Sequence, residues 1–377
     1  MSIDTTKMPK LGFGMMRLPE QDGIIDLSQV CDMVDSYMQS GMNYFDTAYM
    51  YHNGKSESVV KEALVDRYPR DSYFLTTKLP QWMMKGKEDR DKIFNDQLER
   101  TGAGYFDIYL LHSVEDGEKY DGYVEYDCFN WAMEKKAEGK IRHFGFSYHG
   151  TPELLDEILA AHPEVEIVQI QLNYADWDNP LIQSGKLYEV LRKYNMPILV
   201  MEPVKGGSLA QMDSRLEELF QQQRPEATIA SWALRFVGSL PGVVTILSGM
   251  SNQEQMQDNL NTFANFEPLS EKEKETIREV VGKMASMPNI PCTGCRYCVD
   301  GCPQNILIPD IFKALSSLRM SGETWRSQSF YQKLVEQGSG KAETCVACGQ
   351  CEGVCPQHLP ITELMKEAAG KLDTPAE

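Results

Sequence analysis

Two runs of cysteine with identical spacing constrain this chain more than any other feature of its sequence. Each run reads C-x-x-C-x-x-C-x-x-x-C-P, and together they hold eight of the ten cysteines. The eight are Cys292, Cys295, Cys298, Cys302, Cys345, Cys348, Cys351 and Cys355. Cysteines concentrated in one segment indicate metal binding in a reducing compartment, not the cross-linked framework of a small secreted domain.

The spacing within each run is typical of [4Fe–4S] ligands. Three thiolates at intervals of three residues wrap one corner of a cubane cluster, and in two-cluster bacterial ferredoxins the fourth cysteine, before the proline, binds the other cluster. We therefore predict two clusters. Their expected ligands are Cys292, Cys295, Cys298 and Cys355 for one, and Cys345, Cys348, Cys351 and Cys302 for the other. Two structural zinc sites are the alternative, but zinc ribbons use separated C-x-x-C pairs.

The sequence before the cysteines predicts a repeating strand–helix architecture. Eight short apolar segments have the character of strands, and patterns with helical periodicity lie between most of them. The expected strands cover residues 11–15, 43–48, 73–78, 105–112, 143–147, 167–173, 197–202 and 243–248. Eight strands with intervening helices favour a parallel (β/α)₈ TIM barrel. An open doubly wound sheet is the alternative, but no G-x-G-x-x-G follows the first strand to favour it.

The length of 377 residues exceeds what one hydrophobic core usually serves, so we expect two domains. A change in composition separates a barrel over residues 1–288 from a small ferredoxin-like α+β domain over residues 289–377. In the second domain we expect helices at residues 308–318 and 330–336, followed by a loose tail from residue 370.

The charge and the hydropathy of the chain exclude several classes of partner. The net charge is −18, and so acidic a surface repels phosphate backbones and anionic membranes. No apolar run approaches the roughly 20 residues that span a bilayer, and residues 1–10 lack the apolar core of a signal peptide. We therefore expect a cytoplasmic protein with no nucleic-acid or membrane partner. Because such clusters are oxygen-labile, we expect an anaerobic host.

Four polar residues fall where barrel strands end, which is where barrel enzymes place their active sites. They are Asp46, Tyr51, Lys78 and His112. A carbonyl that receives a hydride needs a proton on its oxygen, and tyrosine is normally too weak an acid to supply it. An adjacent lysine ammonium is expected to lower the tyrosine pKa, with an aspartate to hold the lysine and a histidine to orient the carbonyl.

In these residues the sequence resembles the aldo/keto reductase superfamily, over roughly residues 7–265. The matching segments are residues 8–14, 46–51, 78, 110–112, 145–147 and 169–173. The whole chain looks like the branch that ends in a ferredoxin-type domain. From this resemblance Tyr51 is the expected general acid. Lys78 and Asp46 would tune its acidity, and His112 would position the carbonyl.

The resemblance also implies a nicotinamide cofactor, bound at the barrel mouth without a Rossmann fold. Ser147 and Gln169 match residues that hold the carboxamide. Met201 stands where the family has an aromatic residue that stacks on the nicotinamide ring. Lys205, in the loop after that strand, is expected either to contact the pyrophosphate or to be an ordinary solvated lysine.

The adenosine end of the implied nucleotide site departs from the family pattern. Where relatives place a cation, and an arginine six residues later, to bind the 2′-phosphate, this chain has Gly249 and Gln255. Asp258 and Asn259 keep the adenine-side positions. Without a cation at either place, the sequence leaves the choice between NADPH and NADH open.

Nicotinamide passes two electrons as a hydride, whereas clusters pass one at a time, and no flavin fingerprint is found to couple them. Three functions remain. The first is a nicotinamide-dependent reductase of a small carbonyl, or dehydrogenase of an alcohol, whose clusters serve electron transfer or structure. The second is an electron-transfer oxidoreductase that couples the clusters to a barrel-bound group or a partner flavoprotein. The third is a non-enzymatic redox-sensing barrel, which has no need of the four polar residues.

Overall fold

The computed structural model describes residues 3–21, 23–115, 117–179, 182–264, 266–286, 290–321 and 324–373. Contacts divide the chain into two compact units. The first contains residues 1–204 and 220–275, and the second contains residues 205–219 and 276–377. We expected the domain boundary between residues 288 and 289. Residues 287–289 lie outside the described residues.

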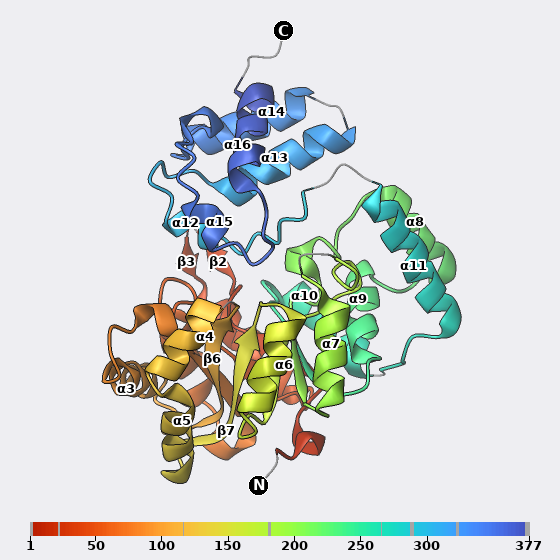
Figure 1. Ribbon diagram of the computed structural model, residues 1–377. Helices are drawn as coiled ribbons and strands as arrows, with labels where there is room; N and C mark the ends of the chain where they lie inside the picture. Colours follow the sequence, from red (N-terminus) through yellow and green to blue (C-terminus); the bar gives the residue numbers. More distant parts are fainter. Residues whose placement is uncertain are drawn as a thin grey trace. The chain divides into compact units, whose positions relative to one another are not determined.

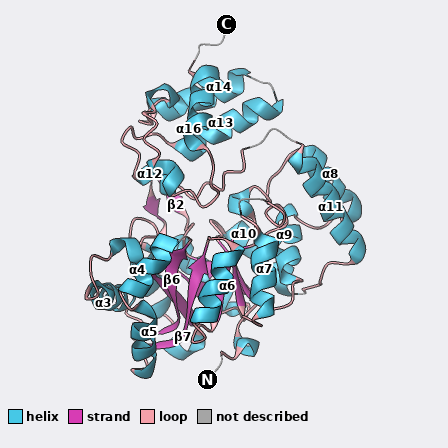
Figure 2. Ribbon diagram, viewed as in Figure 1, coloured by secondary structure: helices cyan, strands magenta, loops and turns pink. Residues whose placement is uncertain are grey.

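The first unit is a closed barrel of eight parallel strands, drawn as magenta arrows in Figure 2. The order around the barrel is β1-β10-β9-β8-β7-β6-β5-β4. The strands are β1 (Leu11–Gly14), β4 (Tyr44–Asp46), β5 (Phe74–Pro80), β6 (Phe106–Val114), β7 (Ile141–Tyr148), β8 (Ile167–Gln171), β9 (Ile198–Met201) and β10 (Val243–Ser248). The predicted TIM barrel is confirmed, and each of its strands overlaps an expected segment.

Helices surround the barrel, and Figure 1 shows α5, α6 and α7 on the outer side of the strands. Two further helices, α8 (Ser214–Gln223) and α11 (Glu271–Ala285), are divided between the two units. The helices of the first unit are α1 (Leu27–Gln39), α2 (Ser56–Val60), α3 (Asp89–Thr101), α4 (Gly117–Glu125), α5 (Cys128–Ala137), α6 (Pro152–Ala161), α7 (Ser184–Lys193), α9 (Ile229–Gly238) and α10 (Gln253–Ala264). They cover the strands because one face of each is apolar. In α1, for example, Val30, Met33, Val34 and Tyr37 are buried at helical spacing.

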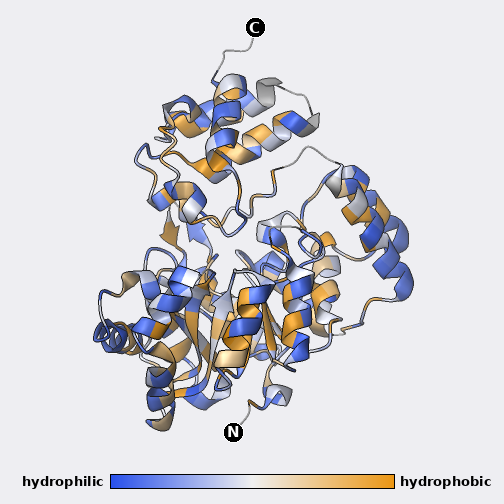
Figure 3. Cartoon of the chain, viewed as in Figure 1, coloured by the Kyte–Doolittle hydropathy of each residue, from blue (hydrophilic) through white to orange (hydrophobic). Residues whose placement is uncertain are grey.

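Two apolar layers hold the barrel together, one between strands and helices and one inside the barrel. The inner layer includes Tyr44, Ile108, Leu110, Ile167, Leu199 and Leu247. Figure 3 shows the same division, because the barrel helices alternate between hydrophobic and hydrophilic residues. A short antiparallel hairpin, β2 (Glu20–Gln21) with β3 (Ile24–Ile25), separates β1 from α1 and was not expected.

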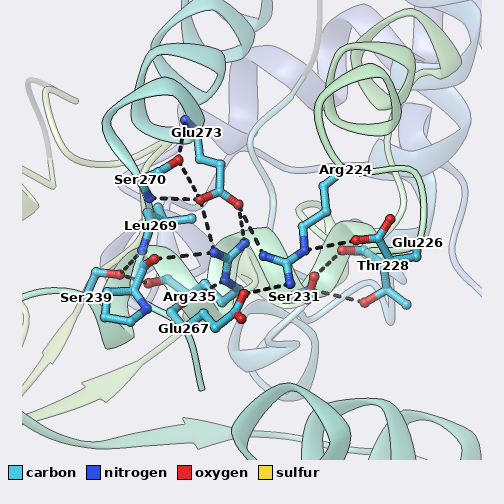
Figure 4. A network of polar contacts seen from close by, with 11 residues as sticks. Arg224, Glu226, Thr228, Ser231, Arg235, Ser239, Glu267, Leu269, Ser270 and Glu273 are labelled. Atoms are coloured by element: carbon cyan, nitrogen blue, oxygen red, sulfur yellow. Dashed lines mark hydrogen bonds and ion pairs between the residues drawn. The ribbon is translucent and has the colours of Figure 1, made fainter. Parts of the chain in front are cut away.

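A buried ion-pair network holds the start of α11 against α9 (Figure 4). Arg235 bonds both carboxylate oxygens of Glu273, at 2.6 and 3.1 Å. Ser270 and Glu273 also form a capping box, because the Ser270 amide donates to Glu273 and the Glu273 amide donates back to the Ser270 hydroxyl. Burial acts to raise the pKa of Glu273, but hydrogen bonds from Arg235 and Ser270 lower it to about 2.

The second unit contains the cysteines and has a small core of its own. Besides parts of α8 and α11, its helices are α12 (Tyr297–Asp300), α13 (Ile308–Ser321), α14 (Thr324–Glu336), α15 (Gln350–Gly353) and α16 (Ile361–Leu372). The expected β component is wrong for residues 290–321 and 324–373, where the structure has no strand. The apolar residues of this unit repeat at helical spacing, as Ile311, Phe312 and Leu315 do in α13, so helices form its core.

The loose tail expected from residue 370 is wrong for residues 370–372. Residues 370–372 belong to α16, because Ala368 and Leu372 are buried on its inner face. Residues 374–377 lie outside the described residues. Within the part of the chain that the structure describes, no helix is both long enough and apolar enough to cross a bilayer.

Candidate active site and cluster sites

The four polar residues predicted at the barrel mouth come from three adjacent strands. Asp46 ends β4, Tyr51 lies in the turn after it, and Lys78 and His112 lie near the ends of β5 and β6. The parallel register aligns Asp46 with Thr76, and Pro80 with His112, so these strand ends meet at one rim. All four side chains are buried, and Tyr51 is the most exposed at 9%.

Lys78 is the centre of this arrangement. Its Nζ donates to Asp46 Oδ1 at 2.6 Å, to the Thr47 carbonyl at 2.8 Å and to the Tyr51 hydroxyl oxygen at 3.3 Å. Because Lys78 is the donor, the hydrogen of the Tyr51 hydroxyl remains available to another acceptor. The His112 ring lies edge-on to the Tyr51 ring with centroids 6.1 Å apart, so the structure brings all four residues together.

The electrostatics of the site differ from the sequence expectation in one respect. We expected Lys78 to lower the pKa of Tyr51. Instead, burial raises the pKa of Tyr51 well above its usual value, and the carboxylates of Asp46 and Glu202 raise it further. Arg17 acts in the opposite direction without overcoming these effects. In this site Tyr51 is therefore a neutral phenol, which is the form that can donate a proton.

The same burial also shifts the pKa values of the other three residues of the site. It raises the pKa of Asp46 and lowers that of Lys78, while their ion pair opposes both shifts. Burial also lowers the pKa of His112 well below its usual value, and the ammonium of Lys78 adds to this effect. His112 is accordingly a neutral imidazole near pH 7, able to donate one hydrogen bond and accept another.

Four buried acceptor or donor atoms around the barrel mouth have no hydrogen-bond partner among the described residues. They are Asp46 Oδ2, His112 Nδ1, Gln169 Oε1 and Glu202 Oε2. A buried polar atom without a partner costs free energy, and such atoms are rare in folded proteins. Their concentration at one rim is the pattern of a site that is completed by a ligand.

The predicted nicotinamide residues lie together at this rim. Ser147 and Gln169 are aligned in register on β7 and β8. The Ser147 hydroxyl accepts from the Ser113 amide at 2.8 Å, and Gln169 Nε2 lies 3.5 Å from the sulfur of Met201 at the end of β9. Trp82, 45% exposed, lies beside His112 with ring centroids 5.1 Å apart and forms part of the wall.

Sequence reasoning missed an ion pair at the same rim. Arg17, in the loop after β1, contacts Glu202, in the loop after β9, at 3.2 Å. The aliphatic part of Arg17 lies against Gly249, since a methyl group at that glycine would be 3.1 Å from Arg17 Cδ. A cation does therefore lie beside the predicted phosphate position, but it comes from a loop distant in sequence. Glu202 has a left-handed backbone, with φ of 56°.

The predicted adenine-side residues lie next to β10, on α10. Asn259 donates to the Ser248 hydroxyl at 2.7 Å, and Asp258 accepts from the Thr228 hydroxyl at 2.9 Å. Lys205 belongs to the second compact unit. Its Nζ donates to Gln357 Oε1 at 3.0 Å, and its side chain is not that of a solvated loop lysine, since only 4% of the residue is exposed.

The cysteines of the second unit line two cavities. The first is lined by Cys292, Cys295, Cys298 and Cys355, and the second by Cys302, Cys345, Cys348 and Cys351. These are the two sets that the spacing assigns to two clusters. Among the described residues, no three His, Cys, Asp or Glu side chains converge on one point as a single zinc ion requires.

The two cysteine loops share their backbone conformation. Gly294 and Arg296 in the first run have φ of 64° and 67°, and Ala347 and Gly349 at the same positions of the second have φ of 53° and 76°. The Gly294 amide consequently turns toward Cys292 and donates to its sulfur at 3.4 Å. Four thiols around each cavity, and the Gly294 amide directed at the sulfur of Cys292 in the first, fit a [4Fe–4S] cluster.

Comparisons with known proteins identify both parts of the chain. A model described as the aldo/keto reductase family matches residues 10–281. A second, described as a 4Fe-4S dicluster domain, matches residues 291–359, so the cysteine unit carries two [4Fe–4S] clusters.

Individual relatives cover the barrel part. The oxidoreductase YqkF of Bacillus subtilis is 24% identical, over 71% of this chain and 91% of its own. The NADH-specific methylglyoxal reductase of Escherichia coli is 25% identical, over 72% of this chain and 94% of its own length. An aldo/keto reductase from Klebsiella pneumoniae was solved with NADP and acetate, and it matches this chain with a TM-score of 0.58 at 22% identity. The match covers 73% of this chain and 92% of that protein. The chain is thus an oxidoreductase of the aldo/keto reductase family, with a 4Fe-4S dicluster domain after the barrel.

Proposed function

We propose that the barrel reduces a small carbonyl compound, or oxidises the corresponding alcohol, with Tyr51 as the proton donor. The observation that carries the proposal is the contact of Lys78 Nζ with the Tyr51 oxygen at 3.3 Å, beside the ion pair to Asp46. This places a positive charge next to a buried hydroxyl at this rim that can protonate a carbonyl oxygen.

The chemistry of Tyr51 follows from this charge and from burial. When its proton leaves, negative charge develops on an oxygen that already accepts a hydrogen bond from Lys78. In a site with little water, such a preorganised ammonium stabilises the developing charge far more than it would in solution. Neutral His112 can donate to the carbonyl oxygen and fix its orientation.

A nicotinamide nucleotide would supply the hydride. Gln169 has a buried carbonyl oxygen without a partner among the described residues, which suits the amide hydrogens of a carboxamide, and Ser147 is next to it in register. Met201 would pack on the ring. Two relatives support this cofactor, since one is named as NADH-specific and another was solved with NADP.

We infer that NADH is preferred over NADPH. Gly249 and Gln255 carry no charge, and Arg17, the cation that reaches Gly249, is paired with Glu202. A 2′-phosphate at this place would compete with Glu202 for Arg17, and its second negative charge would face the carboxylate. Asp258 and Asn259 remain the proposed contacts for the adenine side.

The clusters favour a second candidate function, in which the protein exchanges single electrons with a redox protein partner. Two clusters within one small unit are the usual means of passing electrons one at a time. A cytoplasmic location in an anaerobe remains our prediction. Family membership makes the non-enzymatic alternative the weakest of the three.

One experiment separates these functions. Anaerobically purified, cluster-loaded full-length protein is mixed with NADH and a small ketoaldehyde, and the loss of the reduced nicotinamide absorbance is followed. The same assay is run on Cys298→Ser and Cys351→Ser, which disturb one cluster each. Turnover that survives both changes supports the carbonyl reductase. Absence of NADH binding, with cluster bleaching by a reduced redox protein, would support electron transfer instead.

A further inference from the structure

The two cluster cavities are built from the same sequence pattern but have different surroundings. In each run a glutamine stands two residues after the last cysteine, and both Gln304 and Gln357 line their cavities. Gln357 is buried, with 5% of its surface exposed, whereas Gln304 is only partly buried. The two positions are equivalent in the repeat, so the difference comes from what covers them.

Two residues that follow β9 in the sequence, Lys205 and Gly206, contact lining residues of the cavity of Cys292, Cys295, Cys298 and Cys355. The buried ammonium of Lys205 donates to Gln357 Oε1 at 3.0 Å, and Gln357 is one of the residues that line this cavity. The next residue, Gly206, approaches the backbone of Thr293, another lining residue. A methyl group at Gly206 would lie 1.7 Å from the Thr293 carbonyl oxygen, so only glycine permits this contact.

The cavity of Cys302, Cys345, Cys348 and Cys351 reaches the surface. Cys348 is exposed, and Val346, another lining residue, is 59% exposed. The repeat therefore has one cluster site beside a buried cation and one site beside solvent. Solvent exposure and nearby charge are two of the properties that set the reduction potential of an iron–sulfur cluster.

We propose that Lys205 raises the reduction potential of the cluster held by Cys292, Cys295, Cys298 and Cys355, so that this cluster is the electron acceptor of the pair. A cluster with four thiolates is negatively charged and gains one more negative charge on reduction. A buried ammonium stabilises the reduced form more than the oxidised form, and little water is present to screen it.

The proposal gives the electron a direction. With both clusters bound, a one-electron carrier protein would be oxidised by one electron at the site of Cys302, Cys345, Cys348 and Cys351. The electron would then move to the site beside Lys205, and the first site would return to its oxidised state.

The test is an anaerobic redox titration of cluster-loaded full-length protein, monitored by electron paramagnetic resonance. The main variant is Lys205→Gln, because a glutamine amide can still donate to Gln357 while the charge is removed. Lys205→Arg keeps the charge, and Lys205→Met removes both charge and donor. The control is Lys313→Met, which removes an exposed lysine that acts electrostatically on Cys292. Cys348→Ser labels the signal of the exposed cluster, by changing it or removing it.

We expect Lys205→Gln and Lys205→Met to lower the equilibrium constant for reduction of the unlabelled cluster by about tenfold or more, which for one electron is about 59 mV. Lys205→Arg should retain the wild-type potential, and Lys313→Met should change it much less, because water screens an exposed charge. The proposal is wrong if both potentials are unchanged in Lys205→Gln, if the shift occurs at the cluster that Cys348→Ser labels, or if only Lys205→Met causes it.

Discussion

Two lysines are buried, Lys78 at the barrel mouth and Lys205 in the cysteine unit, and their ammonium groups have different neighbours. Lys78 donates to a carboxylate, a carbonyl and a phenol oxygen, whereas Lys205 donates to the neutral amide of Gln357. Both lysines are nearly inaccessible to water, so the electrostatic effect of either ammonium on its neighbours is not strongly screened. What each lysine does therefore depends on the group beside it that gains negative charge.

At the barrel mouth that group is the Tyr51 oxygen, which becomes negative for the moment of proton transfer. In the cysteine unit it is a cluster, which stays more negative for as long as it holds an electron. The comparison teaches that a buried cation acts on a rate in one place and on an equilibrium in the other. The predictions below test it, beginning with the largest expected effect.

Lys78→Met should lower the rate of carbonyl reduction by about 10³-fold, because the Tyr51 oxygen loses the charge that stabilises it. It should also destabilise the barrel by about 3–5 kcal/mol, since Asp46 is left buried without its partner. Single-turnover rates and urea unfolding measure the two effects. The double variant Lys78→Met/Asp46→Asn should recover part of the stability and none of the rate. Recovery of the rate would contradict the role given to Lys78.

The pair of Arg235 and Glu273 extends the comparison to a buried charge pair that is remote from any reacting group. The pKa of Glu273 is lowered from 4.5 to about 2 in the folded chain, so its contribution is complete above pH 4.5 and is lost as the pH falls toward 2. At pH 7 the lowered pKa of Glu273 contributes about 3 kcal/mol to the free energy of unfolding.

Urea unfolding of wild type and Glu273→Gln between pH 7 and pH 3 measures this contribution. The difference in stability between the two proteins should shrink as the pH falls, while carbonyl reduction by folded Glu273→Gln is unaffected. A stability difference that does not change with pH would show that the ion pair is not its source.

Glu202→Gln sharpens the comparison at the nucleotide end of the barrel mouth. Removing this carboxylate frees Arg17 from its ion pair and removes the charge that a 2′-phosphate would face. We expect the affinity for NADPH relative to NADH to rise by about tenfold, or about 1.4 kcal/mol. Equilibrium titration with both nucleotides measures the ratio, and Arg17→Met in the same background should abolish the gain.

The smallest effect is expected for Lys193→Met. Lys193 contacts Asp156 at 2.7 Å, close to the 2.6 Å of the pair between Lys78 and Asp46, but it lies on the surface. Solvent screening should leave both the stability and the rate unchanged within error. A clear loss of stability would show that distance, not burial, decides the strength of these pairs.

The parts of this molecule that could be predicted from sequence are those with local signals. The eight strands follow from the hydrophobic pattern, and the two cysteine sets follow from the spacing of the cysteines. The position of Lys78 and His112 at the rim follows from the predicted ends of their strands. The hairpin formed by β2 and β3 also had a local signal, the dipeptide Asp-Gly at residues 22 and 23, which was overlooked.

The remainder depended on tertiary structure. Arg17 reaches Glu202 across the end of β10, so no spacing in the sequence connects them. Lys205 pairs with a residue more than a hundred positions away. The raised pKa of Tyr51 comes from burial and two carboxylates, and burial of a turn residue leaves no pattern in the sequence. In the cysteine unit, α13 and α14 overlap the two helices expected from the sequence, whereas the expected strands are absent from residues 290–321 and 324–373.

The most direct test of the central claim is the single-turnover reduction of a small carbonyl by Tyr51→Phe, with Tyr49→Phe as the matched control. Tyr49 lies two residues earlier, and its hydroxyl donates to Asp96 instead of facing Lys78. We predict that Tyr51→Phe loses about 10²–10⁴-fold in the rate of reduction while it binds NADH as wild type does, and that Tyr49→Phe keeps its rate. Reduction by Tyr51→Phe at the wild-type rate would contradict the account.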